Sequence, residues 1–121
     1  MFMLPQEVEV WYIIPAVRKE YAKRLTKHHN LSYEKVGRIL GTTKAAVSQY
    51  LSNKRANKVV LSREVKEMIR ESSKRVARNP KIWLTEVENV LKFMRKTKCS
   101  CNVCKRYNKE ILEYCNCEPK Y

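Results

Sequence analysis

Residues 36–51 read VGRILGTTKAAVSQYL and hold both glycines of the chain, Gly37 and Gly41. Glycine inside a helix costs about 1 kcal/mol relative to alanine, so Gly37 indicates a place where another backbone comes too close for a side chain. Gly41 follows the apolar pair Ile39 and Leu40, where a helix commonly ends in a residue with positive φ. The stretch therefore predicts two short helices joined by a tight turn at Gly41.

Apolar and hydroxyl residues stand where these two helices need them. Val47 can reach back between the helices, and Leu51, four residues later, continues the same apolar side. Ser32 can cap the first helix, and Thr42 or Thr43 the second, because each hydroxyl can accept a hydrogen bond from a backbone N–H of the first turn. The second helix is thus predicted to lie fixed across the first.

The stretch from Leu31 to Arg55 resembles the helix-turn-helix of the phage-repressor family, which includes Cro, lambda repressor and the XRE regulators. A small residue, a glycine and a branched apolar residue fall at the family spacing. Two positions depart from the pattern, because the first small residue is usually alanine and is Gly37 here, and the residue after the turn glycine is often apolar and is Thr42 here. The longer arrangement, with residues 4–11 ahead of the motif and a cysteine cluster behind it, is similar to small predicted archaeal transcriptional regulators.

The resemblance implies binding to double-stranded DNA. In this family the second helix enters the major groove and its early outward residues meet base edges. By position these residues are Thr43, Lys44, Ala45, Ser48, Gln49 and Ser52. Lys44 can donate to guanine, Gln49 can pair with adenine, and Ala45 can touch a thymine methyl group. Asn53, Lys54 and Arg55 follow directly and are placed for phosphate contacts, which position a protein without reading sequence. The alternative for each of these residues is that it is an ordinary solvent-exposed residue of a surface helix, with no contact to DNA.

Basic residues outnumber acidic ones by 26 to 12, which gives a formal net charge of +14. Residues 31–60 hold five of these fourteen net charges, because six basic residues stand there against Glu34 alone. The six are Lys35, Arg38, Lys44, Lys54, Arg55 and Lys58. Such charge is typical of phosphate binding, although RNA or an anionic membrane surface would attract it as well.

No run of about 18 apolar residues is present, so we expect no membrane span. Glu7 and Glu9 stand where a signal peptide would be basic, and its long apolar core is missing. These features predict a cytoplasmic protein.

The rest of the chain reads as helices, and we therefore predict an all-α fold. Residues 8–14 alternate weakly as a strand would, but no turn dipeptide pairs them with a partner. Pro15 suits a first helical position, and an apolar stripe follows at Val17, Tyr21 and Leu25. A later helix is expected to begin at the cap Ser62 and to present Val65, Met68, Ile69, Ser72 and Val76. After Asn79 and Pro80, a further helix shows Leu84, Val87, Leu91 and Met94 at spacings of three and four.

These elements predict three regions. Residues 1–60 form the N-terminal segment and the DNA-binding domain, residues 61–97 a helical region, and residues 98–121 a cysteine-rich tail. The family usually binds DNA as a two-fold dimer, so we expect a homodimer. The helix from Pro80 to Arg95 carries extra apolar residues, which form an interface or simply complete the core of the monomer: Trp83, Val90 and Phe93. The segment from Leu4 to Ile14, with Trp11, is a second candidate interface.

All five cysteines lie in the last 23 residues, at Cys99, Cys101, Cys104, Cys115 and Cys117. The ten-residue spacer 105–114 is long enough for about three helical turns, so the second pair can fold back on the first as a small hairpin. Three chemistries fit such a hairpin. They are an iron-sulfur cluster or redox-active thiols, structural zinc with Cys101 and Cys104 as its one C-x-x-C knuckle, and disulfides. The cysteines could also do no more than hold together a tail that lacks its own core.

Together these features predict a sequence-specific transcriptional regulator in which the cysteine cluster senses redox state or metal supply. The alternative is an RNA-binding or non-specific nucleic-acid-binding protein with a structural zinc or disulfide-stapled tail. An enzyme is not expected, because the sequence has no phosphate-cradling glycine loop, no histidine near the cysteines and no evident paired carboxylates. No small-molecule substrate is evident for the same reason.

Overall fold

The computed structural model describes residues 4–52 and 59–97, and the regular structure in these ranges is entirely helical. The prediction of an all-α fold is therefore confirmed for the described residues. The elements are α1 (Pro5–Val8), the π-helical turn η1 (Glu9–Ile13), α2 (Ile14–Lys27), α3 (Tyr33–Leu40), α4 (Lys44–Leu51), α5 (Arg63–Arg78), the 3₁₀ turn η2 (Pro80–Ile82) and α6 (Trp83–Lys96).

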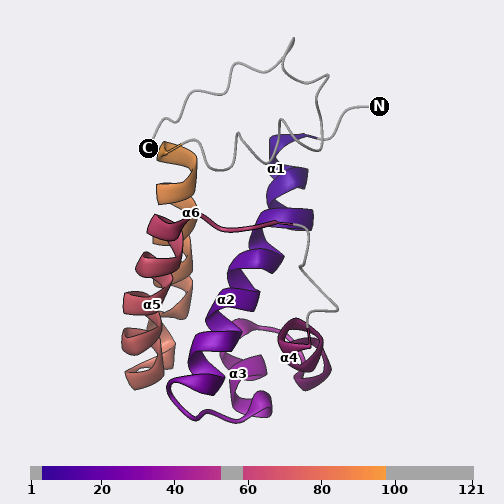
Figure 1. Cartoon of the computed structure of the whole chain (residues 1–121), viewed down its shortest axis with the longest axis vertical. Helices are drawn as coiled ribbons and strands as arrows, with labels where there is room; N and C mark the ends of the chain where they lie inside the picture. The colour runs from indigo at the N-terminus through magenta and orange to yellow at the C-terminus, as the bar shows by residue number, and fades with distance from the viewer. Residues whose placement is uncertain (1–3, 53–58, 98–121) are drawn as a thin grey trace.

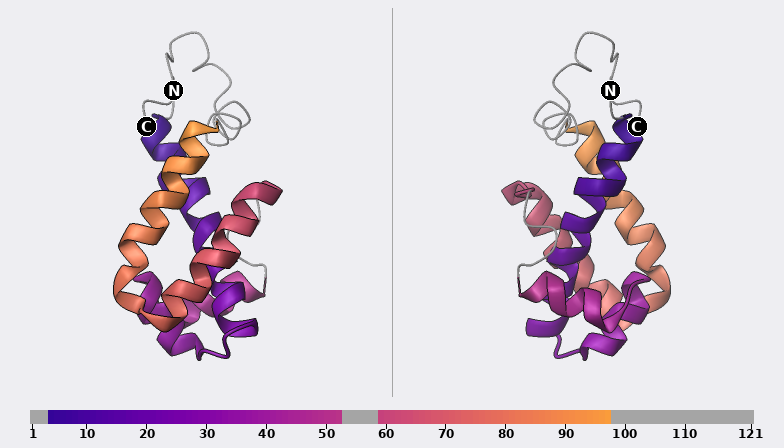
Figure 2. Two further views of the ribbon diagram at one scale, coloured as in Figure 1. Left: turned by 90° about the vertical axis from the view of Figure 1, so that its left-hand side faces the viewer. Right: turned by 90° about the vertical axis from the view of Figure 1, so that its right-hand side faces the viewer.

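A long N-terminal helix, made of α1, η1 and α2 in succession, is the central element (Figure 1). Helix α2 packs against α3, α4 and α5, and α5 packs against α6. Figure 1 shows α5 and α6 along one side of α2, with α3 and α4 around its C-terminal half. Figure 2 shows that α5 and α6 diverge from their connection at η2, so that the end of α6 approaches the N-terminal end of the long helix. Every element therefore contacts the long helix or a neighbour of it.

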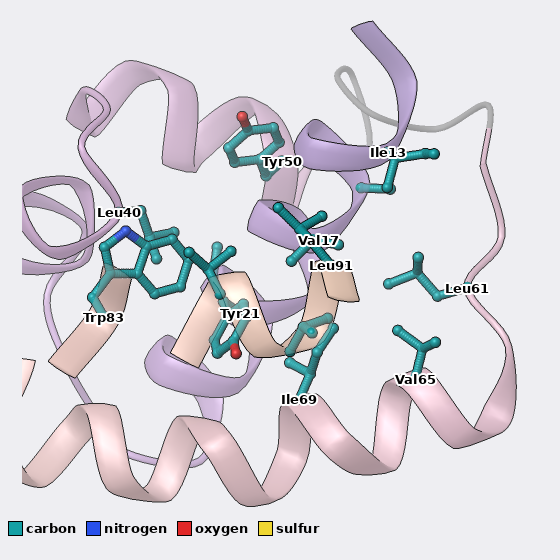
Figure 3. Packing of buried hydrophobic residues seen from close by; sticks show 14 of the residues in the cluster. Ile13, Val17, Tyr21, Leu40, Tyr50, Leu61, Val65, Ile69, Trp83 and Leu91 are labelled. Atoms are coloured by element: carbon teal, nitrogen blue, oxygen red, sulfur yellow. The ribbon is translucent and has the colours of Figure 1, made fainter. Parts of the chain in front are cut away.

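The core is built around the apolar stripe of α2. Val17, Tyr21 and Leu25 are all fully buried, as their spacing of four predicts. Figure 3 shows Val17 and Tyr21 of α2 among side chains from the other helices, including Leu40 of α3, Tyr50 of α4, Ile69 of α5 and Leu91 of α6. Residues on both sides of position 60 contribute to this one core.

Helix α5 follows its prediction closely. The hydroxyl of Ser62 accepts a hydrogen bond from the backbone N–H of Val65 at 3.3 Å, which is the expected N-terminal cap. The predicted inner residues Val65, Ile69, Ser72 and Val76 are buried, and Met68 is half-buried at the edge of the core.

Helix α6 differs from its prediction in one residue. Leu84 is 73% exposed, although its spacing from Val87 and Leu91 predicted a place on the inner stripe. The buried face is instead centred on Trp83, Val87, Val90 and Met94, and Leu84 falls at its edge in the first turn. Trp83 and Val90 thus complete the core of this chain and offer no surface to a second copy. Phe93 is partly buried against the same core.

The N-terminal segment is helical, and its weak strand-like alternation was misleading. Val8 and Ile13 are both buried and stand five positions apart, which is the i→i+5 spacing of a π-helical turn. The N–H of Ile14 donates to the carbonyl of Glu9, five residues earlier. Pro15 follows directly and lacks the N–H that would continue an α-helical ladder, which gives a physical reason for the wide turn at this place.

Candidate nucleic-acid interface

Residues 32–52, which we call the α3–α4 unit, are organised by the end of α3. Ser32 caps the start of α3, where its hydroxyl accepts from the N–H of Lys35 at 3.1 Å. Helix α3 ends at Gly41, which has the left-handed conformation φ 70° and ψ 34°. The N–H of Thr42 then donates to the carbonyl of Gly37 at 2.8 Å. This six-residue closure is the C-terminal arrangement that a glycine with positive φ makes possible.

Gly37 lies where the turn crosses α3. A Cβ atom on Gly37 would lie 3.1 Å from the carbonyl oxygen of Thr42, 3.1 Å from the carbonyl carbon of Thr43 and 3.3 Å from the backbone nitrogen of Lys44. All three atoms belong to the backbone, so none of them can move aside as the end of a flexible side chain could. The prediction that another backbone approaches Gly37 closely is confirmed, because an added Cβ would be in tighter contact with it than most Cβ atoms in proteins are with their neighbours.

Helix α4 begins immediately after this contact. The hydroxyl of Thr43 caps it by accepting from the N–H of Ala46 at 3.0 Å, so Thr43 rather than Thr42 is the capping residue. Ala46, Val47 and Tyr50 are buried and form the inner face of α4. Leu51 is half-buried against the same core, and Figure 3 shows Tyr50 above Val17 of α2. Helix α4 is therefore held by the core on one side only.

The opposite side of α4 carries the described residues that the sequence assigned to DNA reading. Thr43, Lys44, Ala45, Ser48 and Ser52 are exposed, and Gln49 is half-buried. At 100° per residue, the five from Lys44 to Ser52 lie within an arc of about 140°, opposite the buried face. The structure thus brings these side chains together on one surface. Asn53, Lys54 and Arg55 lie outside the described residues.

Two of these side chains have a second task within the chain. The hydroxyl oxygen of Thr43 is used by the cap, which leaves its hydrogen to donate outward. The hydroxyl of Ser52 donates to the carbonyl of Gln49 at 3.3 Å. Lys44, Ala45, Ser48 and the end of Gln49 therefore remain as the side chains best suited to contact a ligand.

The cations of the described α3–α4 unit are all on its surface. Lys35, Arg38 and Lys44 are exposed, and Arg38 forms an ion pair of 2.6 Å with Glu34 one turn earlier on α3. An exposed pair of this kind adds little stability, and it partly neutralises the field of Arg38. Of these three cations, Arg38 is thus the one whose charge is partly neutralised within α3.

A buried polar network joins α2, which packs against α3 and α4, to α5 and α6. The hydroxyl of Ser72 lies 2.7 Å from the hydroxyl of Tyr21 and donates to the carboxylate of Glu86 at 3.0 Å. Since the one hydroxyl hydrogen of Ser72 goes to Glu86, Tyr21 is the donor in its bond to Ser72. Burial raises the pKa of Tyr21 to about 12. This chain of hydrogen bonds joins α2, α5 and α6.

Sequence reasoning missed this network, although one signal for it was present. Ser72 is a polar residue on the otherwise apolar stripe of α5, and a buried hydroxyl needs a partner. The partner Tyr21 is 51 residues away, and nothing local in the sequence identifies it.

None of the protein-family models, curated proteins or solved structures compared with the chain matches it.

The predicted cysteine cluster, Cys99, Cys101, Cys104, Cys115 and Cys117, lies outside the described residues. In residues 4–52 and 59–97, no three side chains of histidine, cysteine or glutamate come together to bind a metal ion. Over the same ranges, the helices are too short or too polar to cross a lipid bilayer.

Proposed function

We propose that this protein is a sequence-specific DNA-binding transcriptional regulator with a helix-turn-helix of the phage-repressor type. In this proposal α3 and α4 are the two helices of the motif, and α4 enters the major groove. The observation that carries the proposal is the close approach of the turn backbone to Gly37. It supports a fixed crossing of α4 over α3, with a buried inner face and a polar outer face on α4.

The outer face of α4 supplies groups that suit base edges. The ammonium group of Lys44 can donate to guanine, the amide of Gln49 can pair with adenine, and Ala45 can touch a thymine methyl group. The hydroxyl of Ser48 can donate or accept a hydrogen bond, so it is compatible with more than one base. Thr43 and Ser52 flank this group at either end of the helix, where they complete the contact surface.

Phosphate contacts would position this face without reading sequence. Lys35 is exposed on the first turn of α3, and the backbone N–H groups of a helix N-terminus favour an anion. Asn53, Lys54 and Arg55 take the same role by their place directly after α4 in the sequence. The net charge of +14 adds a long-range attraction to any nucleic acid.

The test of this proposal is a selection of bound sequences from a random duplex library by the full-length protein. We expect a short enriched sequence, repeated with two-fold symmetry about 10 base pairs apart if the protein acts as a homodimer. The selected duplex should then compete far better than random duplex or single-stranded RNA at the same salt concentration. Equal competition by random duplex would leave no sequence-specific function to propose.

A second candidate is an RNA-binding or non-specific nucleic-acid-binding protein with a structural zinc or disulfide-stapled tail. It is favoured by the spread of basic residues beyond the α3–α4 unit, for example Arg63, Arg70 and Arg78 exposed on α5. A salt dependence that is equally steep for every nucleic acid tested would support this alternative.

The five cysteines extend the main proposal to regulation. We expect them to bind an iron-sulfur cluster or to act as redox-active thiols, with zinc or disulfides as the other chemistries. Absorption spectra with iron, sulfide and zinc analysis of protein purified without oxygen would identify the group. Replacing all five cysteines by serine should then abolish any difference in DNA affinity between reducing and oxidising conditions. If the difference persists, the cysteines are not the sensor.

A further inference from the structure

Three exposed apolar residues lie within eight positions at the N-terminal end of the long helix, and we call them the Trp11 face: Leu4, Val10 and Trp11. Trp11 is 68% exposed, and Leu4 and Val10 are each 59% exposed. The other large exposed hydrophobic residues of the described chain, Tyr33, Val60 and Leu84, lie singly on different segments, as is normal for a protein surface. Three within eight residues of one helix indicate a contact surface instead.

The Trp11 face rests on a well-anchored helix. Val8 and Ile13 of the same segment are buried in the core. The carboxylate of Glu9 accepts from the guanidinium of Arg95 in the last turn of α6, with its Oε1 2.8 Å from Nη2 and 2.9 Å from Nε. At the start of the helix, the N–H of Leu4 donates to the carboxylate of Glu7 at 2.9 Å. The exposed side chains are thus presented by a helix that the core holds in place.

We propose that residues 98–121 of the same chain, the cysteine-rich tail, cover the Trp11 face. This segment starts close to the Trp11 face. It follows Thr97, two residues after Arg95, and Arg95 contacts the residue that directly precedes Val10 and Trp11. A segment of 24 residues can extend up to about 80 Å, so its length is ample for a face that lies next to its starting point.

The tail and the Trp11 face are also complementary in chemistry. Residues 1–17 contain Glu7 and Glu9 and no basic residue, whereas the chain as a whole carries +14. Residues 98–121 hold five basic residues against three glutamates, and so have a net charge of +2. They also hold apolar side chains that can contact the face: Val103, Tyr107, Ile111, Leu112 and Tyr114. The tail therefore matches the Trp11 face in polarity, and its net positive charge can meet the exposed carboxylate of Glu7, because the carboxylate of Glu9 already pairs with Arg95.

A tethered segment also has an advantage over a second copy of the chain. Short linkers give effective concentrations in the millimolar range, which a second molecule reaches only at very high protein concentration. Two copies that met at this face would in addition bring two strongly positive chains together. Both effects favour the tail as the occupant.

The inference deepens the proposed function and rests on it for its meaning. The tail would contact the helix that continues into α2, and α2 packs against α4. Figure 1 shows α1 at the opposite end of the long helix from α3, so the tail would leave the outer face of α4 open to DNA. A change in the oxidation state or the bound metal of the cysteines would then reach α4 through its contact with α2. It would not cover the outer face of α4.

The test measures how easily acrylamide quenches the fluorescence of Trp11 in the full chain as isolated. Trp83 is buried and packs edge-on against Tyr21 at 4.8 Å, so the difference between wild type and Trp11→Phe reports Trp11. A tail variant carries Tyr107→Asp, Ile111→Asp and Leu112→Asp. Circular dichroism checks that this variant keeps the helix content of wild type. A second variant, Arg106→Glu with Lys109→Glu, reverses two tail charges without changing its apolar residues.

The matched reporter is Leu84→Trp in the Trp11→Phe chain, since Leu84 is similarly exposed and stands at the far end of α6 from the tail. We expect Trp11 to be quenched several-fold faster in the first tail variant than in wild type, to an intermediate degree in the second, and the Leu84→Trp reporter to stay unchanged. Shielding should persist at about 1 μM protein, because the tail is tethered.

Equal quenching of Trp11 in wild type and both tail variants would overturn the inference. So would shielding that grows with protein concentration together with a doubled sedimentation mass, because a second copy would then be the occupant. Binding of the selected duplex is measured on the same samples. A Trp11 that is already unshielded in wild type, with intact DNA binding, removes this inference alone, whereas a shielded Trp11 without any sequence-specific binding removes the proposed function alone.

Discussion

The guanidinium of Arg75 donates two hydrogen bonds to the carboxylate of Glu86, from Nε to Oε1 at 2.6 Å and from Nη2 to Oε2 at 3.2 Å. The two residues lie on α5 and α6, and the hydroxyl of Ser72 donates a third bond to the same carboxylate. The bonds from Arg75 are the main reason that the pKa of Glu86 lies below its ordinary value, and the bond from Ser72 adds to the effect.

This lowered pKa makes the stability of the protein depend on pH. The folded state favours the charged carboxylate, so its stabilisation is fully present above the ordinary pKa of 4.5 and is lost as pH falls through the folded value. At pH 7 we expect Glu86→Gln to reduce the free energy of unfolding by about 1 to 3 kcal/mol, and the difference from wild type to shrink towards pH 3. Urea denaturation across this range measures both.

The control is Glu67→Gln, because the exposed carboxylate of Glu67 meets Arg70 on the surface of α5 at 2.9 Å. Exposed pairs contribute little, so this variant should follow wild type at every pH. A constant difference between Glu86→Gln and wild type from pH 7 to pH 3 would contradict the role given to Glu86.

The two buried serines of α5 should respond differently to the same substitution. Ser72→Ala removes the group that joins Tyr21 to Glu86 and should cost about 1 to 3 kcal/mol of unfolding free energy. Ser73 is equally buried, but its hydroxyl donates only to the carbonyl of Arg70 in its own helix, at 2.8 Å. Ser73→Ala should therefore be nearly neutral. Equal losses in thermal or urea denaturation would show that the network adds nothing beyond local bonds.

The two glycines are required for different reasons, and asparagine distinguishes them. Gly41 has φ 70° and nothing within 4 Å of an added Cβ, so Gly41→Ala should cost about 1 to 2 kcal/mol from backbone strain alone. Gly41→Asn should recover much of that loss, because asparagine tolerates the left-handed conformation. Urea denaturation of wild type, Gly41→Ala and Gly41→Asn measures the three free energies of unfolding.

At Gly37 the obstacle is the turn backbone, so both Gly37→Ala and Gly37→Asn should destabilise the protein. Alanine would otherwise gain about 1 kcal/mol as a better helix former, so any loss measures the crowding directly. The loss of stability should be accompanied by weaker DNA binding, since the contact sets the crossing of α3 and α4. A stabilised Gly37→Ala protein would mean that the turn can move aside at no cost.

The proposed DNA-reading and phosphate-binding roles predict different patterns of loss. Gln49→Ala should reduce discrimination at one base pair by about 1 to 3 kcal/mol and leave binding to random duplex almost unchanged. Arg55→Ala should weaken binding to every duplex alike and lower the salt slope by about 1. Gln6→Ala is the control, since Gln6 is exposed at the far end of the long helix. Fluorescence anisotropy with the selected and random duplexes separates the cases, and equal losses in both variants would undo the assignment.

Local chemistry made part of this fold predictable. Helix α3 ends at Gly41 because glycine tolerates a positive φ. Helices α3 and α5 begin at Ser32 and Ser62 because their hydroxyl groups cap the first turn. Each of these signals depends on only a few neighbouring residues. The apolar stripe of α2 is equally local, because a spacing of four places residues on one face. The exposure of Lys44, Ala45 and Ser48 followed from the same periodicity once the turn was placed.

The remainder depended on contacts that periodicity does not describe. Leu84 fits an apolar stripe by its spacing, but the partner helices reach the side of α6 that holds Trp83 and Val90, so Leu84 lies at the edge. The network of Ser72, Tyr21 and Glu86 joins residues that are 14 and 51 positions apart. The roles of the cysteines and of Arg55 remain predictions, since they lie outside the described residues.

The wide turn at η1 means that the N-terminal segment is positioned by a count of residues as much as by their identity. Removing one residue between Val8 and Ile13 would leave a spacing of four, which an α-helix also places on one face, so Val8 could stay in the core. Adding one residue there would instead rotate everything before it by about 100° around the helix axis, turn Val8 out of the core and move Glu9 away from Arg95. Among homologous chains, a deletion of one residue in η1 should therefore be tolerated better than an insertion.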